Sequence, residues 1–361
     1  MRSTRLLGML LALAACESTT ASGDGGGGPQ VDRGARPADA GANPDGGANP
    51  DGGATASAWA GAFWTQPVIN TPADARSPAL IAALAAAGGW GNNGNFQVDF
   101  SFEVLTAGPE VAERAFVPNG DHYTPDCDLD AVPVPPGGAL EGEAGYRCTT
   151  DGDCHLLVWQ PHTHRLFEMW RADLAGDAFS GGCLAVWRTD RCHDAQGRGF
   201  DCTSADAAGL PITPLLFDAD EVAAGAITHT IRFILPNDRI RHRTYAAPAT
   251  HATGAASGGD DALPYGAHLR LRADFPVESL PSAGARVVAR ALQRYGMVLA
   301  DGGQIALTAR GDRSTRAHWE GLLGPHDLVA LQVGDFEVLP LAGVRAWTGD
   351  CERREAPAVC R

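Results

Sequence analysis

The chain has 361 residues, of which 43 are Asp or Glu and 28 are basic, giving a formal net charge of −15 at pH 7. Every basic residue is an arginine, and so acidic a chain disfavours nucleic acid as a partner. Beyond an N-terminal tether roughly 300 residues remain, which is enough for one large β domain or two small ones.

The first 15 residues have the pattern of a bacterial lipoprotein signal peptide. Arg2 and Arg5 precede an apolar run over residues 6–13, and Leu13, Ala14, Ala15 and Cys16 match a lipobox. We expect cleavage before Cys16, acylation of its thiol and attachment to a membrane; an ordinary secretory signal with a coincidental cysteine is the alternative. Glu17, in place of an aspartate, favours the outer membrane, facing the periplasm or the cell surface.

Residues 16–57 are predicted to form a disordered tether. Gly, Ala, Asp, Asn and Pro dominate this stretch, the hexapeptide ANPDGG occurs twice, and almost no side chain suits a core. Residues 58–361 are then expected to fold as a single large β-rich domain. Its first elements are a helix over residues 77–87, with Ser77 as its N-cap, and a half-buried strand from Phe96 to Leu105.

An acidic turn follows these elements. Asp126, Asp128 and Asp130 lie close in sequence, as do Asp151 and Asp153, and carboxylates in such runs are typical calcium ligands. Position 137, where an EF-hand loop starting at residue 126 would need a glutamate, is a glycine. We therefore expect no cofactor, and a bound calcium ion is the alternative interpretation.

The clearest hairpin runs from residue 155 to residue 170, with its turn centred on His162 and Thr163. This register pairs Trp159 with Leu166, and it makes one face the core, through Leu156, Val158, Phe167 and Met169. The opposite face carries Trp159 and Trp170 beside His155 and Glu168, a combination that can stack on and hydrogen-bond a sugar ring. The alternative is that both faces are buried between layers, with Glu168 paired to an arginine.

Residues 203–234 carry the densest pattern in the chain. Gly209 and Pro211 break regular structure, so residues 203–214 are expected to form an ordered loop packed by Leu210 and Ile212. A helix with an Asp218–Glu221 capping box should follow, ending at Gly225. Alternation over residues 227–234 predicts a strand with His229 on one face and Arg232 on the other.

The C-terminal third is predicted to contain four further strands and a helix. A basic cluster over residues 239–243 is either a solvated strand edge or a receptor for an anionic sugar. A strand over residues 267–275 has a cationic face that includes Arg270. Ser282 caps a helix that ends at Gly296, and a hairpin with its turn at residues 301–303 leads towards a last core strand over residues 335–338.

Nine cysteines are present, and assigning Cys16 to the lipid leaves an even number in an exported chain, which predicts disulfides. Proximity in sequence favours Cys148–Cys154, Cys192–Cys202 and Cys351–Cys360, and Cys127 is left with Cys183 by elimination. Zinc is the competing interpretation, because His155 and His193 each adjoin a cysteine, but no CxxC motif occurs.

Four motifs occur in order along the chain: TSADAAGLPI from Thr203, EVAAG from Glu221, LRLRADF from Leu269 and YGMVLAD from Tyr295. On these motifs, roughly residues 63–338 resemble an uncharacterised family of secreted bacterial proteins. The resemblance implies export, and it implies no particular reaction. Asp206, His229, His251 and Asp301 stand at positions where members of that family carry the same residues, whereas Gly302 replaces their asparagine.

These elements predict an all-β or β-rich α+β fold in which two antiparallel sheets pack as a sandwich or jelly roll with a few short helices. The Gly-x-Ser-x-Gly elbow, the Walker loop, the dinucleotide fingerprint and His-Glu-x-x-His do not occur in the sequence. The enzyme classes that depend on those motifs therefore lose their support.

The leading functional prediction is a surface-tethered lipoprotein that recognises a polysaccharide through Trp159 and Trp170, assisted by Glu168, His155, Arg232 and Arg270. A polysaccharide-degrading lyase or hydrolase is the alternative, with Asp206, His229, His251 and Asp301 as catalytic candidates. A structural envelope lipoprotein is the third hypothesis, and no pattern indicates an oligomeric state. An enzyme would bring Asp206, His229 and His251 together in one groove, whereas a binding protein would expose Trp159.

Overall fold

A computed structural model describes residue 59 and residues 62–150 and 152–358. The predicted signal peptide, the tether over residues 16–57 with Cys16, and Cys360 lie outside the described residues. Within this part of the chain, no helix combines the length and the apolar character needed to span a membrane. The same part contains eighteen strands and four α-helices, which confirms the prediction of a β-rich fold with a few short helices.

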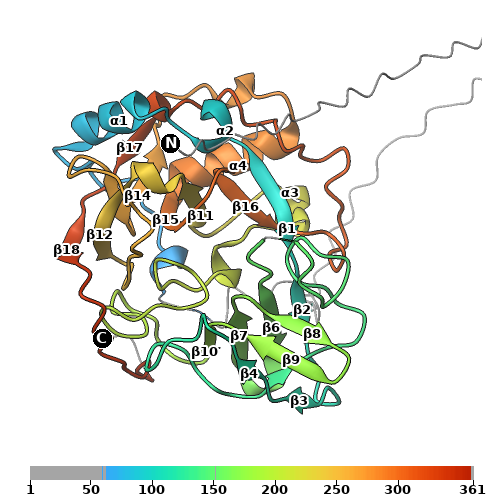
Figure 1. The fold of residues 1–361 in the computed structure, drawn as a ribbon. Helices are drawn as coiled ribbons and strands as arrows, with labels where there is room; N and C mark the ends of the chain where they lie inside the picture. The colour runs from blue at the N-terminus through green and yellow to red at the C-terminus, as the bar shows by residue number, and fades with distance from the viewer. Residues whose placement is uncertain (1–58, 60–61, 151, 359–361) are drawn as a thin grey trace, which may run out of the picture. The chain divides into compact units, whose positions relative to one another are not determined.

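The largest sheet has six strands, in the order β1, β16, β11, β15, β14 and β17 (Figure 1). Their bounds are Val98–Phe102 for β1, Leu307–Arg310 for β16, Ile231–Leu235 for β11, Met297–Gly302 for β15, His268–Leu271 for β14 and Phe336–Val338 for β17. β1 pairs with β16, and β11 with β15, in parallel, whereas β14 is antiparallel to β15 and β17. The sheet is therefore mixed and not purely antiparallel as predicted, because alternation along a strand reports burial and not the direction of its neighbour.

Strands β15 and β16 do not form the hairpin expected around residues 301–303. β11 lies between them: it pairs in parallel with β15, and it is antiparallel to β16, with Phe233 opposite Leu307. As a central strand, β11 is buried on both of its faces, and Arg232 is only 2% exposed. A charged side chain therefore lies at the centre of the largest sheet.

The second sheet has four strands, in the order β10 (Leu184–Arg188), β7 (Arg165–Met169), β6 (Leu156–Gln160) and β2 (Val104–Thr106). Trp159 pairs with Leu166 and Gln160 with Arg165, so the predicted hairpin register is confirmed. The predicted core face is buried, through Leu156, Val158, Phe167 and Met169. His155, Leu157 and Glu168 on the opposite face are buried as well, so this sheet is covered on both sides.

The segment that was predicted as one strand over residues 96–105 joins the two sheets. It breaks at Glu103, and β1 pairs within the six-stranded sheet while β2 pairs within the four-stranded one. Beside this junction Phe102, Val104 and Leu157 form an apolar cluster with Ala205, Ile212 and Leu216 of the loop that follows residue 203. The loop therefore packs against both sheets at the point where the chain passes from one to the other.

Helices cover the edge and one face of the six-stranded sheet. α1 (Ser77–Ala86) packs against β17, and α4 (Ala283–Arg294) packs against β14. Ser77 does not cap its helix, because its hydroxyl accepts the backbone N–H of Val338 at 2.8 Å. Ser282 does act as the predicted N-cap of α4, by accepting the backbone N–H of Ala285.

The remaining helices and sheets are small. α2 (Gly91–Gly94) is a single turn, and α3 (Ala219–Ala224) has the predicted Asp218–Glu221 capping box and ends at Gly225. One three-stranded sheet contains β13 (Leu263–Tyr265), β12 (Ile240–Ala247) and β18 (Ala342–Ala346), and a second contains β4 (Val117–Pro118), β9 (Ala178–Gly181) and β8 (Asp173–Ala175). β3 (Glu113–Arg114) pairs with β5 (Val132–Pro133).

The disulfide pattern agrees only in part with the prediction. Cys127 pairs with Cys183, and Cys148 with Cys154, as expected. Cys202 pairs with Cys351, with a Cα–Cα distance of 4.4 Å, so the predicted pairs Cys192–Cys202 and Cys351–Cys360 are wrong. Cys192 is itself disulfide-bonded. Proximity in sequence failed because the fold brings the C-terminal segment against residue 202, which no local pattern indicates.

Candidate functional site

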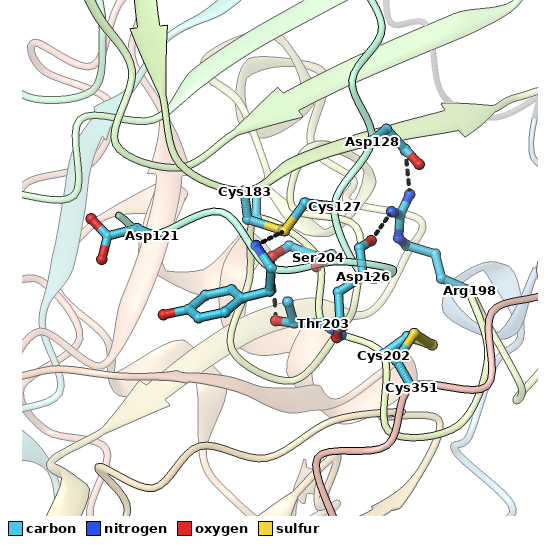
Figure 2. Close-up of a disulfide and its surroundings, with 12 residues drawn as sticks. Asp121, Asp126, Cys127, Asp128, Cys183, Arg198, Cys202, Thr203, Ser204 and Cys351 are labelled. Carbon is cyan, nitrogen blue, oxygen red and sulfur yellow. Dashed lines mark hydrogen bonds and ion pairs between the residues drawn. A yellow bond between two sulfur atoms is a disulfide. The ribbon is translucent and has the colours of Figure 1, made fainter. Parts of the chain in front are cut away.

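The loop over residues 203–214 is the platform of the candidate site. Leu210 and Ile212 are buried, as predicted, and the Ser204 hydroxyl closes the loop by donating to the carbonyl of Leu210 at 2.7 Å. Figure 2 shows the start of the loop, where the backbone N–H of Thr203 donates to Asp126 Oδ2 at 2.8 Å, next to the disulfide between Cys202 and Cys351. The loop is therefore held at its ends by covalent and polar bonds.

Glu168 binds the C-terminal end of this loop. Its carboxylate accepts N–H groups from Ile212 and Thr213 of the loop and from the Trp187 indole, at 2.7–3.0 Å. Burial raises the pKa of Glu168, and these donors oppose the rise. Because Glu168 is fully buried beneath the loop, it is not available to a sugar, and its partners are amides and an indole where the alternative interpretation expected an arginine.

Arg232 contacts two of the predicted catalytic carboxylates, those of Asp206 and Asp301. Its Nη2 lies 2.7 Å from Asp206 Oδ2 and 3.9 Å from Asp301 Oδ2, and its Nη1 donates to the Thr308 hydroxyl at 2.9 Å. Asp206 is fully buried, whereas the Asp301 side chain is 24% exposed. The backbone N–H of Ala207, in the loop, also donates to Asp301 Oδ2 at 3.3 Å. Asp301 is thus the member of this ion cluster that solvent can reach.

The two carboxyl groups hold their protons more tightly than ordinary aspartates. Burial raises the pKa of Asp206 to about 6 against the opposing effect of Arg232. Burial and the charge of Asp206 raise the pKa of Asp301 to about 7, again against Arg232. Two neighbouring carboxyls whose pKa values are raised towards neutrality are an arrangement suited to proton transfer.

His155 supplies a second buried cation beside the loop. Its Nδ1 lies 2.6 Å from Glu141 Oε2 and its Nε2 lies 2.9 Å from the carbonyl oxygen of Ala205. Both partners accept hydrogen bonds, so both ring nitrogens must donate, which requires the protonated imidazolium. Burial alone would lower the pKa of His155, but the charge of Glu141 and its hydrogen bond outweigh burial and raise it to about 9.

Trp170 and Asp153 lie at the edge of this cluster. The Trp170 indole is half-buried and donates through Nε1 to Asp153 Oδ1 at 2.9 Å. Asp153 is exposed, and its charge contributes to the raised pKa values of both Asp301 and His155. Trp170 was a predicted ligand-binding residue, whereas Asp153 had been assigned only to the acidic turn. The sequence pattern that could have pointed to Asp153 is its position two residues before His155, the first residue of the predicted hairpin.

The other predicted site residues do not join the cluster directly. His229 Nε2 faces Glu221 of α3 at 3.3–3.4 Å, and Arg270 donates to Glu337 at 2.6 Å. Burial opposes the charge of Glu221 at His229, and Glu221 prevails, so the pKa of His229 is raised. His251 Nδ1 contacts the Ala207 carbonyl at 2.7 Å, so it supports the loop and makes no bond to Asp206. Asp206, His229 and His251 therefore do not converge in one groove, and the constellation expected of an enzyme built from these three residues is not present.

Trp159 lies apart from Trp170 on the same face of the hairpin. It is half-buried against the main core, whereas Trp170 packs against the cluster between the sheets. Trp159 pairs with Leu166, so Trp170 lies four residues further along, about 13 Å away at the usual rise of a strand. The loop anchored on Glu168 lies over the face between them, so the two indoles do not make one continuous platform.

The acidic turn is occupied by protein donors. Asp126 accepts the backbone N–H of Thr203, and Asp128 forms an ion pair with Arg198 (Figure 2). Asp128 also pairs with Arg353, and Asp130 contacts Arg165. These carboxylates point to separate partners and do not surround a common point, which disfavours calcium there. Glu143, Cys148 and Cys154 also lie close together, but both sulfurs belong to a disulfide and are not metal ligands.

A hollow with a volume of about 400 Å³ lies beside β1, away from the Arg232 cluster. Phe100 and Trp319 line it, together with the backbone around Gly321, Gly324 and Pro325. None of the side chains in the Arg232 cluster lines this hollow, and Trp319 is itself buried. We place the candidate site at Asp301 because the buried ion cluster around Arg232 reaches solvent there, and shape alone does not supply chemistry.

The comparisons with known proteins found no match, so the assignment of the site rests on its geometry. No family model, no curated protein and no solved structure matches the chain.

Proposed function

We propose that this protein is a lipid-anchored envelope protein that hydrolyses a saccharide, with Asp301 as the acid that protonates the leaving oxygen. The observation that carries the proposal is that one buried arginine holds both Asp206 and Asp301, and only Asp301 is open to solvent. Asp206 and Arg232 are positioning residues in this account, because they reach the reacting atoms only through Asp301.

The proposed location rests on the signal pattern and on the cysteines. A lipobox that ends at Cys16 supports lipid anchoring, most consistent with the outer membrane and either its periplasmic or its outer face. The disulfides that tie residues 127, 148 and 202 to their partners support an oxidising compartment. Membership of a secreted bacterial family remains a prediction from the motifs alone.

A saccharide is the substrate class that best suits this site. The half-buried Trp170 indole donates to the Asp153 carboxylate, and an indole beside a carboxylate is a common arrangement around sugar rings. Arg232 and Arg270 are both engaged by carboxylates, so neither is free to receive a uronate. The geometry therefore favours hydrolysis over elimination from an acidic sugar.

The test is incubation of the purified full-length chain with neutral, amino and acidic polysaccharides, followed by assays for new reducing ends and for unsaturated products. We expect reducing ends without unsaturated products. Unsaturated products would show a lyase, and intact polymers across the panel would contradict the proposal.

Carbohydrate recognition without cleavage is the second candidate, favoured by the partial exposure of Trp159 and Trp170. Binding would then be measured on the same polymers by affinity electrophoresis. Retardation that Trp170→Ala abolishes, without any new reducing ends, would replace the hydrolase proposal with a binding protein. A structural envelope role would leave both assays negative.

A further inference from the structure

We propose that a strip of carboxamides at one end of the six-stranded sheet binds the substrate, and that this substrate is a neutral polysaccharide. The carboxamide strip consists of Asn237, Gln304, Asn92 and Gln97. This inference rests on the proposed function of acting on a saccharide, and it adds the residues that bind the sugar and the charge class of the polymer.

The topology of the sheet brings these side chains to one end. β11 and β15 are parallel, so Asn237, just after β11, lies at the same end of the sheet as Asp301 near the end of β15. β16 is antiparallel to β11, and β1 is parallel to β16, so both of these strands begin at that end. Gln304 precedes β16, and Asn92 and Gln97 precede β1. Where a sheet contains parallel strands, ligands commonly bind at their carboxyl ends.

Asn237 lies against the residue that follows Asp301. A Cβ on Gly302 would lie 2.9 Å from Asn237 Cγ, so the carboxamide packs directly on the Gly302 backbone. The N–H of Gly302 donates to Asp301 Oδ1 at 2.7 Å, and the N–H of Ser257 donates to the Asn237 carbonyl oxygen at 2.8 Å. Asn237 is exposed, and within the described part of the chain its carboxamide forms no hydrogen bond. It is therefore open to a ligand beside Asp301.

Contacts join the other members of the strip. A Cβ on Gly91 would lie 2.6 Å from the carbonyl carbon of Gln304, and Gln304 Oε1 accepts the N–H of Asn92 at 3.3 Å. The Asn92 carboxamide donates to Gln97 Oε1, and Gln97 Nε2 lies 2.7 Å from His326 Nδ1. From β15 to β1 the strip crosses three strand spacings, about 14 Å. The strip can therefore contact more than one sugar residue of a polymer.

The segment before β1 has a strained conformation. Asn92 and Asn93 have φ angles of 53° and 62°, and Gly94 follows with a φ of 81°. The N–H of Gly94 closes the turn by donating to the Trp90 carbonyl at 3.1 Å. Successive left-handed residues are costly for L-amino acids, and strain of this kind is concentrated at binding sites. Both asparagines are exposed, so the turn places their side chains at the surface, at the end of the sheet.

The hollow beside β1 adjoins the end of the strip at His326. Pro325 and Asp327, on either side of His326, line this hollow, and the Pro325 carbonyl accepts the first backbone N–H of β1 at 3.1 Å. Phe100 also lines it, half-buried, with its ring centroid 4.6 Å from that of Trp319. The face of an aromatic ring suits the apolar face of a sugar. A polysaccharide bound along the strip therefore meets an aromatic side chain beyond His326.

The chemistry of the strip selects a neutral polymer. A carboxamide both donates and accepts hydrogen bonds, as a sugar hydroxyl does, and it carries no charge that attracts an anion. The exposed carboxylate of Asp238 follows Asn237, and Asp301 lies nearby. Arg239 is engaged by two carbonyl oxygens, those of Gly89 and Trp90. With a formal net charge of −15, the protein disfavours an acidic polymer at this surface.

The experiment measures binding of the full-length chain by affinity electrophoresis, with one polysaccharide in each gel. The neutral probes are hydroxyethylcellulose, galactomannan, arabinoxylan and dextran, and the acidic probes are carboxymethylcellulose, alginate and polygalacturonate. The variants are Asn237→Ala, Asn237→Asp and Gln304→Ala. Asn70→Ala is the control, because Asn70 is exposed and lies next to the segment in which the N–H of Val68 donates to Arg294, just before β15 begins. Asn70 is thus an exposed carboxamide towards the opposite end of β15.

We expect at least one neutral polymer, and no acidic polymer, to retard the wild type. Each substitution of Asn237 or Gln304 should raise the dissociation constant about 5–15-fold, as the loss of one hydrogen bond does, without lowering the thermal midpoint. Asn237→Asp keeps the size of the side chain and removes its donor, so it separates hydrogen bonding from shape. Asn70→Ala should bind within about twofold of the wild type.

Three results would overturn the strip: no retardation by any neutral polymer, retardation by an acidic one, or variants that bind as tightly as the wild type. The expected retardation without new reducing ends would support the strip and defeat hydrolysis. New reducing ends that all three variants release with the KM of the wild type would defeat the strip and leave hydrolysis in place.

Discussion

At the scale of single residues, Glu168 has the clearest structural role near the site. Its carboxylate accepts N–H groups from Ile212, Thr213 and Trp187. Because the Glu168 side chain is fully buried, water cannot replace those bonds. Glu168→Gln presents an amide N–H to donors that need an acceptor. We expect the free energy of unfolding to fall by about 2–4 kcal/mol in urea titrations.

The matched control for that variant is Glu320→Gln, since Glu320 is exposed at the surface. It should change the free energy of unfolding by less than about 0.5 kcal/mol. Equal effects of the two substitutions would show that Glu168 does not hold the loop.

His155 should make stability depend on pH in the alkaline range. Its pKa is raised from 6.5 to about 9, so the folded protein binds this proton more tightly than the unfolded chain. The stabilisation is fully present below pH 6.5 and is lost as the pH rises through about 9. Urea unfolding between pH 6 and pH 10 should therefore show a decline that His155→Gln lacks, and parallel profiles would refute the buried imidazolium.

At this scale, much of what was predicted came from local bonding rules. The Asp218–Glu221 box and the Ser282 cap are confirmed because each involves residues within one helical turn. The loop partners of Glu168 and the partner of Ser77 were not predictable, because they lie on segments far away in the sequence. Binary patterns report whether a position is buried and not what it meets there.

At the scale of elements, the loop over residues 203–214 depends on Gly209. Its φ is +73°, and a Cβ there would lie 2.3 Å from the Thr250 hydroxyl and 2.6 Å from the Cys202 carbonyl oxygen. Gly225 has a similar φ of +85° but open space around it. Gly209→Ala should therefore destabilise the fold by roughly 1–3 kcal/mol more than Gly225→Ala in thermal or urea unfolding. Equal losses would mean that the loop tolerates displacement.

The hairpin and the central strand show what an element's sequence can and cannot reveal. The β6–β7 register was predictable because a short turn fixes the pairing of adjacent strands. The insertion of β11 between β15 and β16 was not, because their partners are chosen by tertiary packing over long connections. That insertion brings Arg232 and Asp301 together, so the candidate site depends on the part of the topology that local patterns miss.

At the scale of the whole molecule, the disulfides tie the site to the tail. Peptide mapping without reduction should link the peptide containing Cys202 to the one containing Cys351, and Cys127 to Cys183. The reason is geometric, since only cysteines brought within bonding range by the fold can be oxidised together. A Cys192–Cys202 peptide as the main product would contradict the described fold.

The lipid anchor proposed at Cys16 can be tested by labelling. A bacterial host that acylates lipoproteins should incorporate labelled palmitate into the wild type and not into Cys16→Ser. The variant should also move from the detergent phase to the aqueous phase in Triton X-114 partitioning. Label that persists in Cys16→Ser would place the lipid, and therefore the anchor, elsewhere.

The central claim is that Arg232, Asp206 and the loop make Asp301 an acid for hydrolysis. It is tested most directly by the rate of saccharide cleavage in Asp301→Asn compared with the wild type, at equal thermal stability of the two proteins. The account predicts a loss of about 10²–10⁴-fold on unactivated polysaccharide. Equal rates in the two proteins, or a folded wild type that cleaves no saccharide, would contradict it.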